Sequence, residues 1–177
     1  EHLLLSEDKL FYVDKLYNEI WAIELKKDYQ LRDIGKFPNV SAIAFTNNKL
    51  FITSRTKSRI AVIDYDTLGL ISEFTTAGKP VGMLAIEGNV YVLGAQNNEI
   101  QKINAETLNV AGTIELKTGG FSTGFSKICG EDLYIVTDLK NNMYSVVDLK
   151  NGKLLQTYAL NVPIKEVVVA NRVQVFD

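Results

Sequence analysis

Carboxylate side chains, or the matching amide, stand directly after four regularly spaced apolar runs of the chain. These residues are Glu24, Asp64, Asn104 and Asp148. Carboxylates that converge on one site can act as general acids, general bases or metal ligands. Each of these residues falls once in a copy of a repeat, so we expect them at equivalent positions of different structural units. We therefore interpret them as acceptors for backbone N–H groups of turns.

Histidine and cysteine each occur once, as His2 and Cys129. A lone cysteine forms neither an intrachain disulfide nor a multi-cysteine metal site. These two counts remove most zinc, copper, haem and catalytic-triad chemistry, and we predict no cofactor, no metal and no catalytic residue. Cys129 lies in a predicted strand and is interpreted as a small buried apolar residue.

Cationic and aromatic side chains occur in the polar segments between the apolar runs. On loops held by a rigid scaffold, such groups can anchor an anionic or peptide-like partner, and the alternative is that they are solvated loop residues. The candidate set is Tyr17, Lys36, Phe37, Arg55, Lys57, Lys79 and Phe121.

Two charges fall on predicted inner strands, where a lysine needs water or a carboxylate partner. They are Lys127 and, one repeat later, Glu166. The pair either lines a water-filled channel or forms an internal salt bridge, and we favour the salt bridge.

The apolar runs that separate these polar residues recur with a fixed period. The second residue of each copy is at position 10, 50, 90, 133 and 173, which gives steps of 40, 40, 43 and 40 residues. A constant period in this range indicates one supersecondary unit copied in tandem.

One unit contains four strand patterns and no helical periodicity. In the clearest copy these are residues 41–45, 49–53, 59–64 and 70–75, with Asn47-Asn48 as the first turn. Four short consecutive strands in about 40 residues are typical of a β-propeller blade. The small apolar residues of the first strand favour its position next to the axis.

The sequence thus predicts an all-β chain, a β-propeller of four-stranded antiparallel blades with four blades and part of a fifth. The predicted single domain, 1–177, divides into repeats of about 1–40, 41–80, 81–123 and 124–163, with a partial repeat at 164–177.

The repeat resembles that of a known family. Leu-Phe-Ile-Thr-Ser at 50–54, Ile-Ala-Val-Ile-Asp at 60–64 and Gly-Lys-Pro at 78–80 are similar to the YVTN-type β-propeller repeat, as is Met-Tyr-Ser-Val-Val-Asp at 143–148. The resemblance covers essentially the whole chain. It implies bacterial or archaeal surface or periplasmic propellers, among which are binding proteins, lactonase-like enzymes and haem enzymes.

Such propellers usually close with six to eight blades, more than this chain holds. A ring cut in mid-blade exposes sheet edges. We therefore expect a longer propeller, or a second chain that completes the ring.

The composition narrows the function further. The net charge of −2 gives no field suited to nucleic acid, and no apolar run reaches the length of a membrane span. We expect a non-enzymatic scaffold that presents loops to a protein or small-molecule partner, in the periplasm or at the cell surface, with the cytoplasm as the alternative. The alternative functions are a lactonase- or lyase-type enzyme with its catalytic residues outside this segment, and a structural or oligomerisation array.

Overall fold

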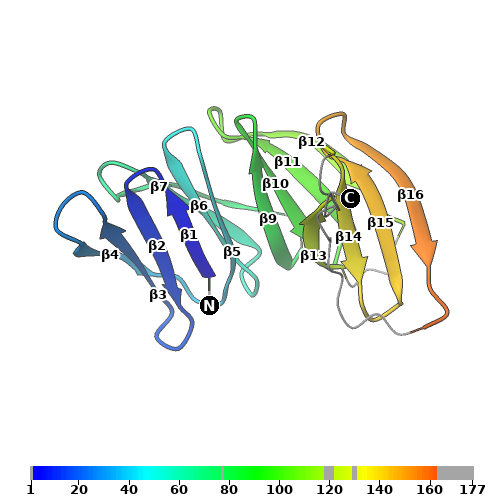
Figure 1. Ribbon diagram of the computed structural model, residues 1–177, viewed down its shortest axis with the longest axis horizontal. Helices are drawn as coiled ribbons and strands as arrows, with labels where there is room; N and C mark the ends of the chain where they lie inside the picture. Colours follow the sequence, from blue (N-terminus) through cyan, green and yellow to red (C-terminus); the bar gives the residue numbers. More distant parts are fainter. Residues whose placement is uncertain (1, 77, 118–121, 129–130, 163–177) are drawn as a thin grey trace, which may run out of the picture.

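The computed structural model describes residues 2–76, 78–117, 122–128 and 131–162, and in this part of the chain every regular element is a β-strand (Figure 1). Blade 1 consists of β1 (His2–Ser6), β2 (Lys9–Asp14), β3 (Glu19–Glu24) and β4 (Gln30–Lys36). Blade 2 consists of β5 (Val40–Thr46), β6 (Lys49–Ser54), β7 (Arg59–Asp64) and β8 (Leu70–Thr75). Blade 3 consists of β9 (Pro80–Ile86), β10 (Asn89–Gly94), β11 (Glu99–Asn104) and β12 (Val110–Glu115). Blade 4 consists of β13 (Ser122–Lys127), β14 (Tyr134–Asp138), β15 (Met143–Asp148) and β16 (Lys153–Ala159).

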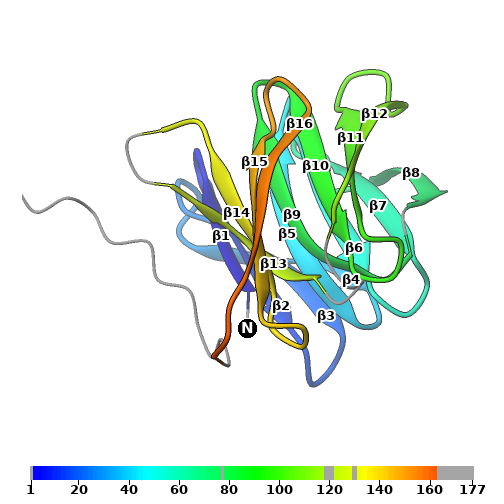
Figure 2. The same cartoon turned by 90° about the vertical axis from the view of Figure 1, so that its right-hand side faces the viewer.

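Each blade is an antiparallel meander in which sequential strands are neighbours. The first strands of successive blades, β1, β5, β9 and β13, lie side by side, and the fourth strands lie farthest from them (Figures 1 and 2). The predicted β-propeller of four-stranded blades is therefore confirmed. The predicted partial fifth repeat, 164–177, lies outside the described residues.

Tight turns join the first two strands of blades 2 and 3. Asn47 and Asn48 have φ of 48° and 55°, and Glu87 and Gly88 have φ of 46° and 73°. Positive φ at both central residues is the mark of a type I′ turn, whose twist matches that of the flanking strands. Asparagine and glycine tolerate this conformation, which explains their presence at these positions.

A residue with positive φ also precedes every third strand. In each blade its carbonyl oxygen accepts the N–H of the residue directly after the fourth strand, so it ties the second turn to the segment that follows that strand. These residues are Asn18, Ser58, Asn98 and Asn142, and the donors are Phe37, Thr76, Leu116 and Leu160.

Blade 4 is shifted by one residue from the register that the sequence pattern predicts. The turn residue before β15 is Asn142 rather than Asn141, and Tyr134 rather than Leu133 occupies the position of Leu10 in β2. The cause is the longer connection between β13, which ends at Lys127, and β14, which begins at Tyr134.

Three apolar clusters fill the spaces between the four blades. In blade 2, Leu50 and Ile52 of β6 pack against blade 1, whereas Phe51 between them packs against blade 3. Strand β7 alternates in the same way, so the two middle strands of this blade, β6 and β7, are buried on both faces. The third cluster joins blades 3 and 4.

The inner strands of blades 3 and 4 approach each other closely at Gly82 of β9. A Cβ at this position would lie 3.2 Å from Cδ2 of Phe125 in β13. A larger residue would push Phe125 away, so glycine is needed here for the close approach of the two strands.

Blade 1 is buried on one face only. Along β2 and β3 buried and half-buried residues alternate, and the face away from blade 2 carries two cross-strand rows. We call this the open face of blade 1; its residues are Leu3, Tyr12 and Trp21 in one row and Leu5, Leu10, Ile23 and Leu31 in the other. Leu3 and Leu5 are 65% and 67% exposed.

Candidate functional site

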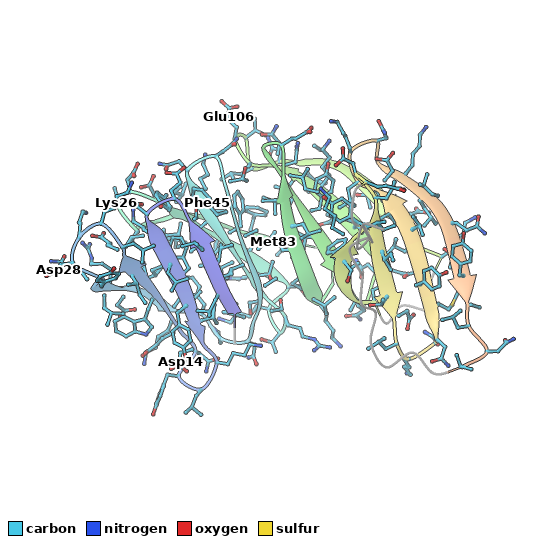
Figure 3. All side chains as sticks on the ribbon, viewed as in Figure 1. Asp14, Lys26, Asp28, Phe45, Met83 and Glu106 are labelled. Atoms are coloured by element: carbon cyan, nitrogen blue, oxygen red, sulfur yellow. The ribbon has the colours of Figure 1, made fainter. Side chains whose placement is uncertain are left out.

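The turns and loops of the blades gather at two opposite ends of the molecule. Figure 3 places Asp14, the last residue of the second strand of blade 1, at one end, and Glu106, in the turn between the third and fourth strands of blade 3, at the other. The loops that lead into the inner strands share the end of Asp14, because they begin where the fourth strands finish.

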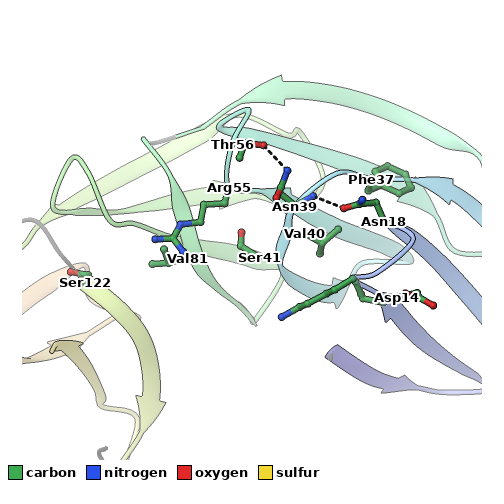
Figure 4. Close-up of a pocket in the computed structure, with 12 residues that line it drawn as sticks. Asp14, Asn18, Phe37, Asn39, Val40, Ser41, Arg55, Thr56, Val81 and Ser122 are labelled. Atoms are coloured by element: carbon green, nitrogen blue, oxygen red, sulfur yellow. Dashed lines mark hydrogen bonds between the residues drawn. The ribbon is translucent and has the colours of Figure 1, made fainter. Parts of the chain in front are cut away.

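A pocket of about 420 Å³ opens at the Asp14 end, between blades 1 and 2 and the first strands of blades 3 and 4 (Figure 4). Its lining comes from four loops and strand starts. The residues are Val13, Asp14, Lys15, Asn18, Phe37, Asn39, Val40, Ser41, Arg55, Thr56, Val81 and Ser122.

Hydrogen bonds between three loops shape the pocket wall. The side-chain oxygen of Asn18 accepts the N–H of Asn39 at 3.1 Å, and Nδ2 of Asn39 donates to Oγ1 of Thr56 at 3.3 Å (Figure 4). The N–H of Arg55 donates to the carbonyl oxygen of Asn39 at 3.0 Å. Asn39 therefore links the second turns of blades 1 and 2, and this makes the wall a defined surface rather than a set of separate loops.

The floor of the pocket is apolar. Val13 and Val40 are buried, and Val81 and the ring of Phe37 are half-buried. Ser41 lies among them, and its hydroxyl is 3.0 Å from Oγ1 of Thr53. The pocket therefore combines an apolar base with polar groups at its rim, as ligand sites commonly do.

Within the part of the chain that the structure describes, two cations and one carboxylate line the pocket. Lys15 and Arg55 are exposed, and within the described residues neither side chain is part of an ion pair. One oxygen of Asp14 accepts the N–H groups of Leu16 and Tyr17 at 2.9 and 3.1 Å, which fixes the turn that carries Lys15.

Of the predicted loop residues, Phe37 and Arg55 line the pocket. Tyr17 is 64% exposed and Lys57 is also exposed, both in second turns but outside the lining. Lys36 pairs with Glu19 at 3.5 Å. Lys79 has φ of 53° and its N–H donates to the Ser58 hydroxyl. Phe121, Glu166 and Cys129 lie outside the described residues.

The predicted inner-strand lysine has a partner within its own blade. Nζ of Lys127, at the end of β13, lies 3.6 Å from Oδ1 of Asp132, and its side chain is 56% exposed. Water and this carboxylate both offset its charge. The pairing with Glu166 stays a prediction, because Glu166 lies outside the described residues.

The repeated acids hold turns in three of the four blades. Oδ1 of Asp64 accepts the N–H groups of Asp66 and Thr67 and the hydroxyl of Thr67. These bonds, led by the N–H of Thr67, lower the pKa of Asp64. Asn104 and Asp148 accept from the same turn positions.

Glu24 departs from this pattern. Its side chain is 5% exposed and its carboxylate lies 3.0 Å from Nζ of Lys27. The longer side chain forms an ion pair across the turn in place of the N–H bonds that an aspartate makes.

Sequence reasoning pointed to this end of the molecule but missed most of the lining. Lys15, Asn18, Asn39, Ser41 and Thr56 were not in the candidate set, because their convergence depends on the angle between blades. Their spacing did carry one signal, since Asn18 and Thr56 fall in the same turn of consecutive repeats.

At the opposite end, a polar cluster joins blades 1 and 2. The hydroxyl of Tyr65 donates to Oδ1 of Asp8 at 2.6 Å and to the carbonyl oxygen of Ser6 at 3.0 Å. The ammonium group of Lys9 lies 3.9 Å from the centre of the Tyr65 ring. Burial, with a further contribution from Asp8, raises the pKa of Tyr65 to about 12, and the bond from Tyr65 lowers the pKa of Asp8.

Within the described residues, no three His, Cys, Asp or Glu side chains come together to hold a metal ion. In the same part of the chain, no helix is long and apolar enough to cross a membrane.

No protein-family model and no curated protein sequence matches the chain. Solved structures do match. Hydrazine synthase from Kuenenia stuttgartiensis is 13% identical, with a TM-score of 0.73 over 86% of this chain and 46% of that one. The WD40 repeats of RRP9 are 11% identical, with a TM-score of 0.67 over 84% and 47% of the two chains.

A catalytically inactive virginiamycin B lyase from Staphylococcus aureus, solved with quinupristin, is 20% identical. Its TM-score is 0.73 over 91% of this chain and 55% of that one. The chain has a β-propeller fold. It spans about half the length of these propellers. At these identities the likeness concerns the fold alone.

Proposed function

We propose that this propeller chain is a non-enzymatic binding scaffold, and that the pocket between blades 1 and 2 is its ligand site. The observation that carries the proposal is the wall built by Asn18, Asn39 and Thr56, which fixes three loops around an apolar floor. A pre-formed concave site of this volume is the usual form of a small-molecule site.

The polar groups of the pocket favour binding over catalysis. Among the described residues that line it, Asp14 is the one carboxylate and is bonded to its own turn, and none is a histidine or cysteine that could serve as base or nucleophile. The cations and hydroxyls that remain are suited to orienting a ligand.

A thermal-shift screen of a mixed set of anionic, neutral and cationic small molecules tests this proposal. Compounds that stabilise the chain are re-tested on Thr56→Trp, which places a large side chain at the pocket rim. Thr113→Trp, an exposed position on the outer strand β12, is the matched control.

We expect the stabilising compounds to lose their effect on Thr56→Trp, to keep it on Thr113→Trp, and to be recovered chemically unchanged. Stabilisation that is the same on both variants, a screen without any binder, or conversion of a bound compound to a product would contradict the proposal.

We further propose that additional blades, in the same protein or from a second chain, cover the open face of blade 1. Support comes from the apolar rows on that face, which repeat the pattern that Leu50, Ile52, Ala61 and Ile63 of blade 2 present to blade 1.

We also propose a periplasmic or cell-surface location, which rests on the resemblance of the repeat to the YVTN type. A fusion of the protein to alkaline phosphatase, which is active only after export, checks the location.

A further inference from the structure

We infer that the ligand of this pocket is a small organic acid, in which a carboxylate is bound by Arg55 and Lys15 and an apolar body rests on the valine floor. This inference deepens the proposed binding function and rests on it.

The pocket has an excess of positive charge. Arg55 and Lys15 line it, and among the described residues of the lining the only carboxylate is Asp14. Two other cations at this end of the molecule already form ion pairs, Lys36 with Glu19 and Arg59 with Glu73. Arg55 and Lys15 have no such partner among the described residues, so an anionic ligand would supply the missing charge.

The free donors favour a carboxylate over a phosphate. Phosphate sites commonly use a cradle of unpaired backbone N–H groups. Here four N–H groups at the rim are already hydrogen-bonded: that of Asn39 binds Asn18, that of Arg55 binds Asn39, and those of residues 16 and 17 bind Asp14. The rim offers the guanidinium group of Arg55, whose planar fork matches a carboxylate in bidentate geometry, and the ammonium group of Lys15 as a second cation.

The backbone of Arg55 is held in place. Its N–H bond to Asn39 and the bond from Asn39 to Thr56 fix the turn from which the side chain extends. In Figure 4 the Arg55 side chain reaches from this turn across the pocket toward Val81, and Ser41 lies between it and Asn39 and Val40. A carboxylate bound there would have Val40 and Val81 as its apolar neighbours.

The apolar floor selects against a strongly hydrated anion. Val81 and the ring of Phe37 are half-buried and present carbon surface, which gains free energy when an apolar group displaces water from it. An aromatic or branched aliphatic acid satisfies both the floor and the cations.

The test uses 3-phenylpropionate as the ligand and 3-phenylpropionamide as its neutral isostere. Each is titrated into the ¹⁵N-labelled chain and followed by amide chemical shifts. We expect the acid to shift the signals of residues 15–18, 39–41 and 55–56, and the amide to bind at least about tenfold more weakly, as loss of a charge-assisted hydrogen bond requires.

Variants assign the effect to the guanidinium group. Arg55→Ala should weaken the acid about tenfold, and Arg55→Lys, which keeps the charge without the fork, should be intermediate. Arg32→Ala, an exposed arginine on the outer strand β4, makes the same charge change and should have no effect. Arg55 is exposed, so its replacement should leave the spectrum of the folded chain intact.

Equal binding of acid and amide, unchanged binding to Arg55→Ala, tighter binding of inorganic phosphate than of the acid, or no binding of the acid at millimolar concentration would each overturn the inference. A neutral compound from the thermal-shift screen that is lost on Thr56→Trp would overturn it as well, while leaving the proposed binding function intact.

Discussion

Single side chains at the two ends of the molecule stabilise it through different contacts. At the pocket end, amides and hydroxyls fix loops, as Asn39 does between blades 1 and 2. At the other end, Tyr65 fastens the third turn of blade 2 to the first turn of blade 1 through Asp8 and Ser6. In blade 4 the ion pair of Lys150 with Glu87 of blade 3, at 2.9 Å, spans the corresponding gap.

Tyr65→Phe should lower stability at neutral pH and remove a step in its alkaline dependence. The pKa of Tyr65 is raised from 10.0 to about 12, so its contribution to the free energy of unfolding is complete below pH 10 and is lost as the pH rises toward 12. Urea unfolding between pH 7 and pH 12 measures this. Tyr29→Phe, at a 70% exposed position, is the control and should keep the step; a step of equal size in Tyr65→Phe would contradict the assignment.

Asp64→Ala should lower the unfolding midpoint by a few degrees, because the turn loses an acceptor worth about 1 kcal/mol. Asp64→Asn should retain the midpoint at neutral pH, since Asn104 fills the same role in blade 3. The pKa of Asp64 is lowered, so its contribution is present above the unfolded pKa and is lost as the pH falls through the depressed value. Thermal unfolding from pH 7 to pH 2 should therefore show a larger acid-side loss in the wild type than in Asp64→Asn.

At the scale of strands and blades, alternation decides which side chain enters which cluster. Leu50 and Phe51 are adjacent in sequence and belong to different inter-blade clusters. The strands, their order and the I′ turns could be predicted because apolar alternation and Asn/Gly turns are local signals. The register of blade 4 could not, since a longer first hairpin moved Tyr134 into the position predicted for Leu133.

The pocket was only partly predictable, because it depends on contacts between residues that are distant in the sequence. Turn positions in the repeat locate Arg55 and Phe37 at the correct end, but the lining also depends on how blades 1 and 2 are inclined to each other. Asn39 bonds to residues 21 positions before it and 17 after it, and no local pattern reveals such links.

Leu50→Ala and Leu5→Ala make the same chemical change on the two kinds of blade face. Leu50 is fully buried between blades 1 and 2, so its truncation should cost about 2–5 kcal/mol. Leu5 is 67% exposed on the open face of blade 1, and its truncation should change the stability of the isolated chain by less than about 0.5 kcal/mol. Chemical denaturation of both variants measures the difference; equal losses would mean that the open face is covered within the chain.

At the scale of the whole molecule, the two outer blades differ from the inner ones. The middle strands of blade 2 are buried on both faces, whereas those of blades 1 and 4 alternate between buried and half-buried residues. On the outward face of blade 4, Tyr144 and Tyr158 stack with ring centres 4.8 Å apart. These outward faces are where further blades would add.

Covering the open face of blade 1 should be visible in the fluorescence of Trp21, the only tryptophan of the chain. Addition of a blade, in a longer protein or a second chain, should move its emission to shorter wavelength and increase the mass found by light scattering. Leu5→Arg should prevent both changes, and Leu31→Arg on the same row should do so too. Emission that is insensitive to assembly would contradict this placement.

The double burial of blade 2 also bears on how the chain folds. Because its residues are divided between clusters shared with blades 1 and 3, the blade has no core that it completes alone. A hairpin such as β6–β7 can form early through local contacts, yet it becomes stable only when a neighbouring blade docks. Folding should therefore spread from blade to blade along the chain, and the blade 2–3 pair, enclosed by clusters on both sides, is the expected starting point.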